Sequence, residues 1–275
     1  MIKLVGFDLD DTLLNSKKEI QDIDAVKELL KKGIKVCFCS GRPYVQTVKN
    51  YYQEIGLSEG YYVAFNGVAV YDLKTDELIY GNYLNEREVK HIGNIINNKI
   101  KANFKEEDFA VYCYKLDNTM ISTRLNQYVM LEEKFNDAHI NIGNFFNKSE
   151  PCHKIMISGE PHLINELFDI IKDDLKDDFE VLISMPFFIE IYQKHNDKYK
   201  GLMIVANKYG IKEDEVMGFG DSLNDLPLVE NAYIGVAMAN SVPEVKKVAK
   251  YVTLDNDHYG VTNALIKYGL INKKI

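Results

Sequence analysis

The first third of the chain alternates between continuous apolar runs and amphipathic segments, which predicts strands and helices in turn. The apolar run of Ile2, Leu4, Val5 and Phe7 leads into Asp8 with no turn residue between them, which is typical of a strand buried on both faces. Further elements are expected along this part of the chain: strands at 34–39 and 62–65, and helices at 22–32 and 43–55. Such alternation indicates parallel strands joined by right-handed crossovers.

The pattern changes in the middle of the chain, where short strands and helices mix and Asn, Lys and Glu are frequent. Strands are expected at 110–114, 154–158, 180–184 and 187–192, and helices at 86–100, 126–135 and 162–172. We interpret residues 83–192 as a second, α+β domain that is inserted into the first. The first domain then combines residues 1–82 with residues 193–275.

The alternation of strands and helices returns in the last part of the chain. We expect strands at 216–219, 233–236 and 251–253, a helix at 200–209, a helix with Pro227 in its first turn, and a helix from a capping box at Ser241 and Glu244 through residue 249. The expected fold class is therefore α/β, with a doubly wound parallel sheet built from both ends of the chain.

Composition places few limits on this reading. The 275 residues are 46% hydrophobic and 27% charged, which is ordinary for a soluble globular protein. The net charge of −8 argues against nucleic acid or an anionic membrane as the main partner. No apolar run approaches the ~20 residues of a membrane span, no signal peptide is expected, and a cytoplasmic location follows. Cys37, Cys39, Cys113 and Cys152 are expected as reduced, buried thiols, and the oligomeric state stays open.

Polar clusters follow three of the expected strands, at the points where those strands end. They are Asp8, Asp10 and Thr12 after the first strand, Ser40 and Gly41 after the second, and Asp221, Asn224 and Asp225 after a strand of the C-terminal part. Open α/β sheets place ligands at this edge. Each cluster alone is also what an Asp-rich turn would show. Three clusters at one edge favour a shared ligand.

The residue types in these clusters suit a hard cation together with a phosphoryl group. Two carboxylates ~4 Å apart repel by roughly 4 kcal/mol at an effective dielectric of 20, and a divalent cation offsets that repulsion. Hydroxyl, backbone N–H and lysine groups bind phosphate oxygens. The sequence therefore predicts Mg²⁺ as cofactor and a small phosphorylated metabolite as partner.

The clusters also resemble a known family, the haloacid dehalogenase superfamily, and within it the Cof-type phosphatases. Asp8-Leu9-Asp10-Asp11-Thr12 is similar to the nucleophile motif DxDxT, Ser40-Gly41-Arg42 to the second motif, and Gly220-Asp221-Ser222-Leu223-Asn224-Asp225 to the fourth motif GDxxND. Further stretches typical of this branch are 65–67, 236–240 and 257–261. Asp11 stands where the family often has glycine, and aspartate tolerates similar backbone angles.

The resemblance implies roles for individual residues. Asp8 would be the nucleophile that forms an aspartyl phosphate, and Asp10 the general acid and base. The implied metal ligands are Asp8, Asp10 through its carbonyl, Asp221 and Asp225; the implied phosphate-binding residues are Leu9, Ser40, Gly41, Lys198 and Asn224; and Thr12, Arg42 and Asn66 would contact substrate or support the fold. The insertion would be an α/β cap of the C2B type that selects the leaving group.

The third motif of the family, a lysine after a Glu-Ile strand, has two candidates. The spacing from Glu190 and the preceding Asp197 favour Lys198, whereas the neighbouring Gly201 favours Lys200. We take Lys198 as the phosphate-binding lysine and keep Lys200 as the alternative.

Two enzymatic functions and one regulatory function fit these motifs. The first is a Mg²⁺-dependent phosphatase for small metabolites such as sugar phosphates. The alternative is a sugar phosphomutase similar to phosphomannomutases, which would retain and reorient a bisphosphate. The third is a regulatory module switched by phosphorylation of its aspartate, which the length of the chain and the large insertion disfavour. No motif in the insertion identifies the substrate.

Overall fold

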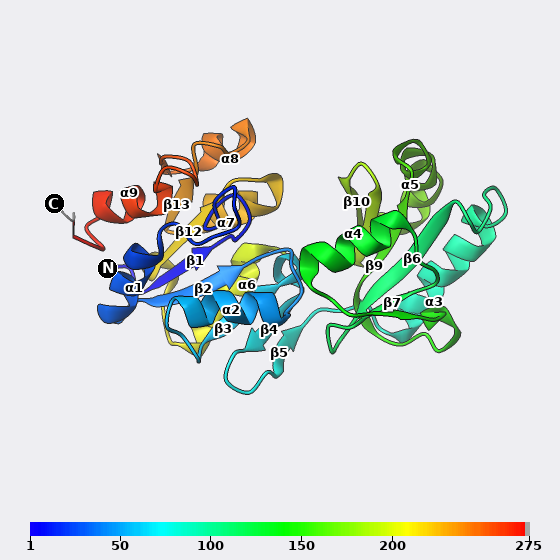
Figure 1. The fold of residues 1–275 in the computed structure, drawn as a ribbon, viewed down its shortest axis with the longest axis horizontal. Helices are drawn as coiled ribbons and strands as arrows, with labels where there is room; N and C mark the ends of the chain where they lie inside the picture. The colour runs from blue at the N-terminus through cyan, green and yellow to red at the C-terminus, as the bar shows by residue number, and fades with distance from the viewer. Residues whose placement is uncertain (273–275) are drawn as a thin grey trace. The chain divides into compact units, whose positions relative to one another are not determined.

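The computed structural model describes residues 1–272 and divides the chain into two compact units (Figure 1). The first unit combines Met1–Tyr80 with the segment from Asn196 onward, and the second is Gly81–His195. The boundaries expected from the sequence, 82/83 and 192/193, fall within a few residues of these.

A mixed sheet with the strand order β14-β13-β12-β1-β2-β3-β4-β5 forms the centre of the first unit. Its strands are β1 (Leu4–Phe7), β2 (Lys35–Cys39), β3 (Tyr61–Ala64), β4 (Ala69–Asp72), β5 (Leu78–Gly81), β12 (Val216–Gly220), β13 (Ile234–Ala237) and β14 (Tyr251–Val252). All residues of β1 are buried, and β1 pairs in parallel with β2 on one side and β12 on the other. The predicted α/β core with strands from both ends of the chain is confirmed.

The edge of this sheet formed by β3, β4 and β5 differs from the prediction. The chain turns at η1 (Phe65–Gly67), where Asn66 has a left-handed φ of 56°, and returns as β4 antiparallel to β3. The tight turn at Asn66 and Gly67 was expected, but β4 and β5 were not. Both strands are only four residues long, which is too short for a clear period in the sequence.

Helices cover both faces of the sheet in the first unit. They are α1 (Ile23–Lys31), α2 (Gln46–Glu54), α6 (Lys198–Lys208), α7 (Leu226–Asn231), α8 (Pro243–Val248) and α9 (Gly260–Lys267). Leu202 and Val205 of α6 belong to one apolar cluster with Cys37 of β2. On the opposite face of β2, the ring of Phe38 stacks on Tyr52 of α2, with centroids 4.1 Å apart. The sheet is therefore doubly wound.

Three helix boundaries in this unit correct the prediction. The helix expected over 43–55 begins at Gln46, because Val45 is still extended. The expected capping box at Ser241 is wrong, since α8 begins after Val242 and has no side-chain cap. The helix expected from residue 200 begins at Lys198, and α9 was not predicted.

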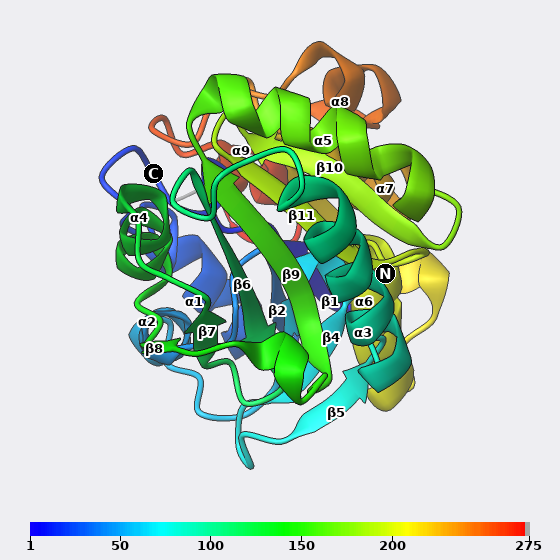
Figure 2. The same ribbon diagram turned by 90° about the vertical axis from the view of Figure 1, so that its right-hand side faces the viewer.

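The second unit is an α+β layer built on a sheet with the order β10-β11-β9-β6-β7-β8. Its elements are α3 (Glu86–Ile95), η2 (Ile96–Ile100), β6 (Phe109–Lys115), β7 (Met120–Ser122), α4 (Gln127–Asn136), β8 (Ile140–Ile142), η3 (Phe145–Asn147), β9 (Cys152–Gly159), α5 (Pro161–Leu175), β10 (Phe179–Met185) and β11 (Phe188–Gln193). Figure 2 shows α3 and α5 on the near face of this sheet, and their apolar side chains share one cluster with β6, β9 and β11.

The predicted elements of this unit are present, with differences at their ends. The helix expected over 86–100 is α-helical to Ile95 and continues as the π-helix η2. The short strands β7 and β8 were not predicted. Within residues 1–272, no helix is both long and apolar enough to cross a membrane.

Candidate active site

The candidate site lies where three neighbouring strands of the first unit end. β12, β1 and β2 are adjacent and parallel, so the residues that follow them emerge at one edge of the sheet. Asp8 follows β1, Ser40 follows β2 and Asp221 follows β12. The turn after β1 requires a left-handed residue, and Asp11 takes that position with a φ of 59°.

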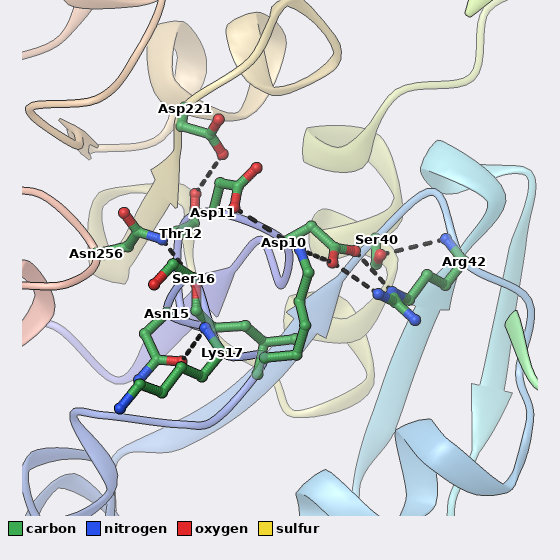
Figure 3. A network of polar contacts seen from close by, with 12 residues as sticks. Asp10, Asp11, Thr12, Asn15, Ser16, Lys17, Ser40, Arg42, Asp221 and Asn256 are labelled. Atoms are coloured by element: carbon green, nitrogen blue, oxygen red, sulfur yellow. Dashed lines mark hydrogen bonds and ion pairs between the residues drawn. The ribbon is translucent and has the colours of Figure 1, made fainter. Parts of the chain in front are cut away.

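Three carboxylates from the two ends of the chain meet at this edge. Asp8, Asp221 and Asp225 are buried, and each offers one oxygen within 4.8 Å of the oxygens of the others. The Thr12 hydroxyl donates a hydrogen bond of 2.8 Å to Asp221, as Figure 3 shows, and the Ser222 hydroxyl donates another of 2.8 Å. These contacts fix the orientation of the Asp221 carboxylate.

Asp225 is held by the backbone of its own turn. Its Oδ2 atom accepts hydrogen bonds of 3.0 Å from the backbone N–H groups of both Asp221 and Ser222. Gly220 leaves room for this arrangement, because a Cβ atom there would lie 2.3 Å from the Cβ atom of Asp225. The glycine and the aspartates of the GDxxND pattern therefore depend on one another.

Lys198 bridges two of these carboxylates. Its Nζ atom lies 2.6 Å from Oδ1 of Asp8 and 2.5 Å from Oδ1 of Asp225, and its side chain is 1% exposed. The alternative, Lys200, is 56% exposed and pairs with Asp197 at 3.4 Å. The structure thus brings Lys198 into the cluster and leaves Lys200 at the surface.

The electrostatics of the cluster favour a bound cation. Burial raises the pKa of Asp8 well above its usual range, the charge of Asp225 raises it further, and Lys198 opposes both. Burial and Asp225 likewise raise the pKa of Asp221 to about 6. Buried carboxylates that resist ionisation lose that resistance when a divalent cation binds them. The oxygen donors of this cluster fit Mg²⁺, which takes carboxylate ligands.

Asp10 is held by a different set of partners, outside the group of three carboxylates (Figure 3). Arg42 donates from Nε to Oδ2 at 2.6 Å and from Nη2 to Oδ1 at 2.7 Å. Lys18 donates to Oδ1 at 3.0 Å. Burial would raise the pKa of Asp10, but the hydrogen bonds and charges of Arg42 and Lys18 lower it to about 2.

The remaining phosphate-binding candidates lie close together. The backbone N–H of Asn66 donates to the Ser40 carbonyl at 2.9 Å, and the Asn224 side chain donates to Oδ1 of Asn66 at 3.1 Å. A Cβ atom on Gly41 would lie 3.3 Å from the Asn66 side chain. Leu9 is fully buried and stands between Asp8 and Asp10, in the turn after β1. Asn66 therefore connects the turns after β2, β3 and β12.

Several residues of this edge were not expected from the sequence. Lys18 returns to Asp10 from the loop that follows the turn after β1, and no motif in the sequence indicates this contact. The Asn240 side chain donates to the Asp11 carbonyl at 2.7 Å, and Asp257 accepts from the backbone N–H of Ser16 at 2.9 Å. These two contacts involve the stretches 236–240 and 257–261, and they tie the C-terminal segments to the loop after β1.

A sequence model described as haloacid dehalogenase-like hydrolase matches residues 5–265. YxeH of Bacillus subtilis is 28% identical over 272 residues, which cover 96% of this chain and 97% of the relative. A second Bacillus subtilis relative, named 5-amino-6-(5-phospho-D-ribitylamino)uracil phosphatase YitU, is 27% identical over 274 residues and covers 96% and 97% of the two chains.

Solved structures of similar fold cover nearly the whole chain. TM0651 from Thermotoga maritima superposes with a TM-score of 0.85 at 28% identity, over 100% of this chain and 99% of that one. A haloacid dehalogenase-like hydrolase from Bacteroides thetaiotaomicron gives a TM-score of 0.84 at 28% identity, over 98% and 100% of the chains. The similarity therefore includes both units.

Proposed function

This chain belongs to the haloacid dehalogenase-like hydrolase family and is a phosphatase, and from that premise we propose that it hydrolyses small phosphorylated metabolites with Mg²⁺ as cofactor. The observation that carries the proposal is the buried group of Asp8, Asp221 and Asp225 beside Lys198. Such a set provides a nucleophile, cation ligands and a positive charge for a phosphoryl oxygen in one place.

Asp8 is the proposed nucleophile. Its carboxylate attacks phosphorus while the bond from phosphorus to the leaving oxygen breaks, and an aspartyl phosphate forms. The negative charge of a bound phosphomonoester raises the pKa of the neighbouring Asp10 carboxyl, so Asp10 takes up a proton from solvent on substrate binding and gives it to the leaving oxygen in this step. In the second step water attacks the phosphorus, Asp10 takes a proton from that water, and inorganic phosphate leaves Asp8 unchanged. The two steps together consume one water molecule for each phosphomonoester.

The other residues of the edge bind and orient. Asp8, Asp221, Asp225 and the Asp10 carbonyl would hold Mg²⁺, which when bound offsets the repulsion between carboxylates and phosphate. Thr12 keeps Asp221 in place through its hydroxyl. The proposed partners of the phosphoryl oxygens are Ser40, Lys198, Asn224 and the backbone N–H groups of Leu9 and Gly41. Asn66 supports Asn224 from the neighbouring turn.

The proposed substrates are small metabolites such as sugar phosphates. The relative YitU is named for a phosphate ester on a ribityl chain, and a ribityl chain is a polyol similar in size to a simple sugar. The proposed location is the cytoplasm, since the four cysteines are free and buried, as thiols are in a reducing compartment.

The experiment that tests this function measures phosphate release from p-nitrophenyl phosphate and from a panel of phosphorylated sugars and polyols. We expect turnover with Mg²⁺, no turnover with EDTA, and a loss of about 10³-fold or more in kcat for Asp8→Asn. Asp11→Asn is the control, because the Asp11 side chain is 58% exposed. Activity that persists in EDTA would contradict the metal role. Conversion of one sugar phosphate into its isomer, dependent on a bisphosphate primer, would establish the mutase instead.

A further inference from the structure

The contact between Arg42 and Asp10 has the geometry of a two-pronged clamp. Both carboxylate oxygens of Asp10 are engaged, Oδ2 by Nε at 2.6 Å and Oδ1 by Nη2 at 2.7 Å. A planar guanidinium that meets a carboxylate in this way fixes the rotation of the carboxylate as well as its distance. The side chain of Arg42 is 16% exposed and that of Asp10 is 35% exposed, so the clamp is shielded from water only in part.

The arginine is itself anchored at its backbone. Its carbonyl accepts hydrogen bonds from the Tyr62 hydroxyl at 3.0 Å and from the backbone N–H of Phe65 at 3.3 Å. Its own N–H donates to Oγ of Ser40 at 3.2 Å. Arg42 therefore starts from a fixed point between the ends of β2 and β3, and its side chain reaches Asp10 from there (Figure 3).

We propose that Arg42 is a positioning residue that holds the Asp10 carboxylate in the orientation from which it exchanges a proton with the substrate's leaving oxygen. This inference rests on the proposed function. Each carboxylate oxygen has two lone pairs. Oδ1 accepts from both Arg42 and Lys18, whereas Oδ2 accepts from Nε of Arg42, so Oδ2 retains the site for the proton.

The geometry disfavours Arg42 as a direct ligand of the phosphoryl group. The guanidinium that would have to turn toward a phosphate is already committed through two of its nitrogens to Asp10. Lys198 supplies the buried positive charge next to the nucleophile. Arg42 thus acts through Asp10, and its loss affects the step in which the leaving oxygen needs a proton.

Leaving groups of different basicity separate these roles. Nitrophenolate departs with little protonation, whereas an alkoxide from glycerol phosphate requires a proton in the transition state. The value of kcat/KM depends on the steps up to the transfer of the phosphoryl group to Asp8. It does not depend on the later hydrolysis of the aspartyl phosphate. We expect Arg42→Met to lower kcat/KM for glycerol phosphate at least about tenfold more than for p-nitrophenyl phosphate.

Matched variants complete the series. Arg42→Lys, which keeps the charge but has one prong, should recover part of the lost selectivity for glycerol phosphate and also tests the proposal if Arg42→Met folds poorly. Lys17→Met, at the exposed residue next to Lys18 in the loop after β1, should leave kcat/KM unchanged for both substrates. In a protein that already carries Asp10→Asn, replacing Arg42 should lower kcat/KM for glycerol phosphate by less than about a further threefold. The two substitutions then disable the same proton transfer and are not additive.

Three results would overturn the proposal. Equal losses for both substrates in the Arg42 variants would mean a structural role or direct phosphate binding. A loss of vanadate affinity of about tenfold or more in Arg42→Met, measured by thermal shift, would place Arg42 on the phosphoryl group. Additive losses in the Asp10→Asn background would separate Arg42 from Asp10. Wild-type enzyme with no Mg²⁺-dependent turnover would instead overturn the proposed function, and the positioning role with it.

Discussion

At the scale of single residues, the position of Lys198 shows how sensitive this site is to one helical register. Lys198 and Lys200 both lie in the first turn of α6, yet one is enclosed by two carboxylates and the other faces solvent. The sequence could predict that a lysine belongs here, because the chain resembles a family that has a lysine shortly after a Glu-Ile strand. The spacing from Glu190 and the preceding Asp197 favoured Lys198, but Lys200 stayed an alternative, because the direction of each side chain depends on where the helix begins.

This difference gives the first prediction, on the free energy of unfolding. Lys198→Met leaves two buried carboxylates without their counter-charge, and we expect a loss of about 3–5 kcal/mol in urea titrations. The matched variant Lys200→Met removes an exposed charge and should change stability by less than about 0.5 kcal/mol. Added Mg²⁺ should restore part of the loss in Lys198→Met. Equal effects of the two substitutions would show that Lys198 is not enclosed as described.

At the scale of elements, the turn after β3 is docked against the start of α6. Gly67 has a φ of 96°, and a Cβ atom there would lie 2.1 Å from the carbonyl oxygen of Asp197, which caps α6. A glycine after an asparagine predicts a turn, as the sequence indicated. The approach of a segment from the other end of the chain could not be predicted, because it depends on tertiary packing and leaves no local pattern. The same reason explains why β4 and β5 were missed.

The second prediction separates backbone strain from steric contact at two glycines. Gly33 also has a positive φ, 78°, but no atom lies within 4 Å of its missing Cβ. We expect Gly33→Ala to cost about 1–2 kcal/mol, which is the strain of a left-handed alanine. Gly67→Ala should lower the free energy of unfolding by about 1–3 kcal/mol more than Gly33→Ala does, because the start of α6 must move to make room for the methyl group. Thermal or urea unfolding measures both, and similar losses would contradict the close approach of Asp197.

At the scale of the whole molecule, motifs at opposite ends of the chain predicted a single site, and the structure brings Asp8 and Asp221 together. That inference was possible because parallel strands end at one edge of a sheet. The second unit offered no such rule. Its buried polar residues, among them His153 in β9, carry no motif, so only the structure shows that this histidine is fully buried.

The third prediction concerns the pH dependence of stability that this histidine imposes. Burial lowers the pKa of His153 from 6.5 to about 4. Between these two pH values the unfolded chain binds the proton more readily than the folded chain. The contribution of neutral His153 to stability is therefore fully present above about pH 6.5 and is lost as the pH falls toward 4. The difference between a pKa of 6.5 and one of about 4 corresponds to about 3 kcal/mol of the free energy of unfolding at most.

The control for this effect is His153→Gln, which keeps a polar side chain and cannot titrate. In urea titrations between about pH 7.5 and 4.5, the wild-type protein should lose more stability than the variant, and the two curves should converge in slope above about pH 7. Parallel curves over the whole range would show that His153 binds its proton equally well in the folded and unfolded states.

The pairing of β1 with β12 also has a consequence during protein synthesis. Asp221 follows its partner Thr12 by 209 residues, which corresponds to a delay of about 10–40 s at ordinary rates of translation. Throughout that delay the growing polypeptide carries Asp8 without Asp221 and Asp225, and it exposes one unpaired edge of β1. A chain that is released between these two points would therefore lack the completed carboxylate group and would be prone to aggregate through the open edge of β1.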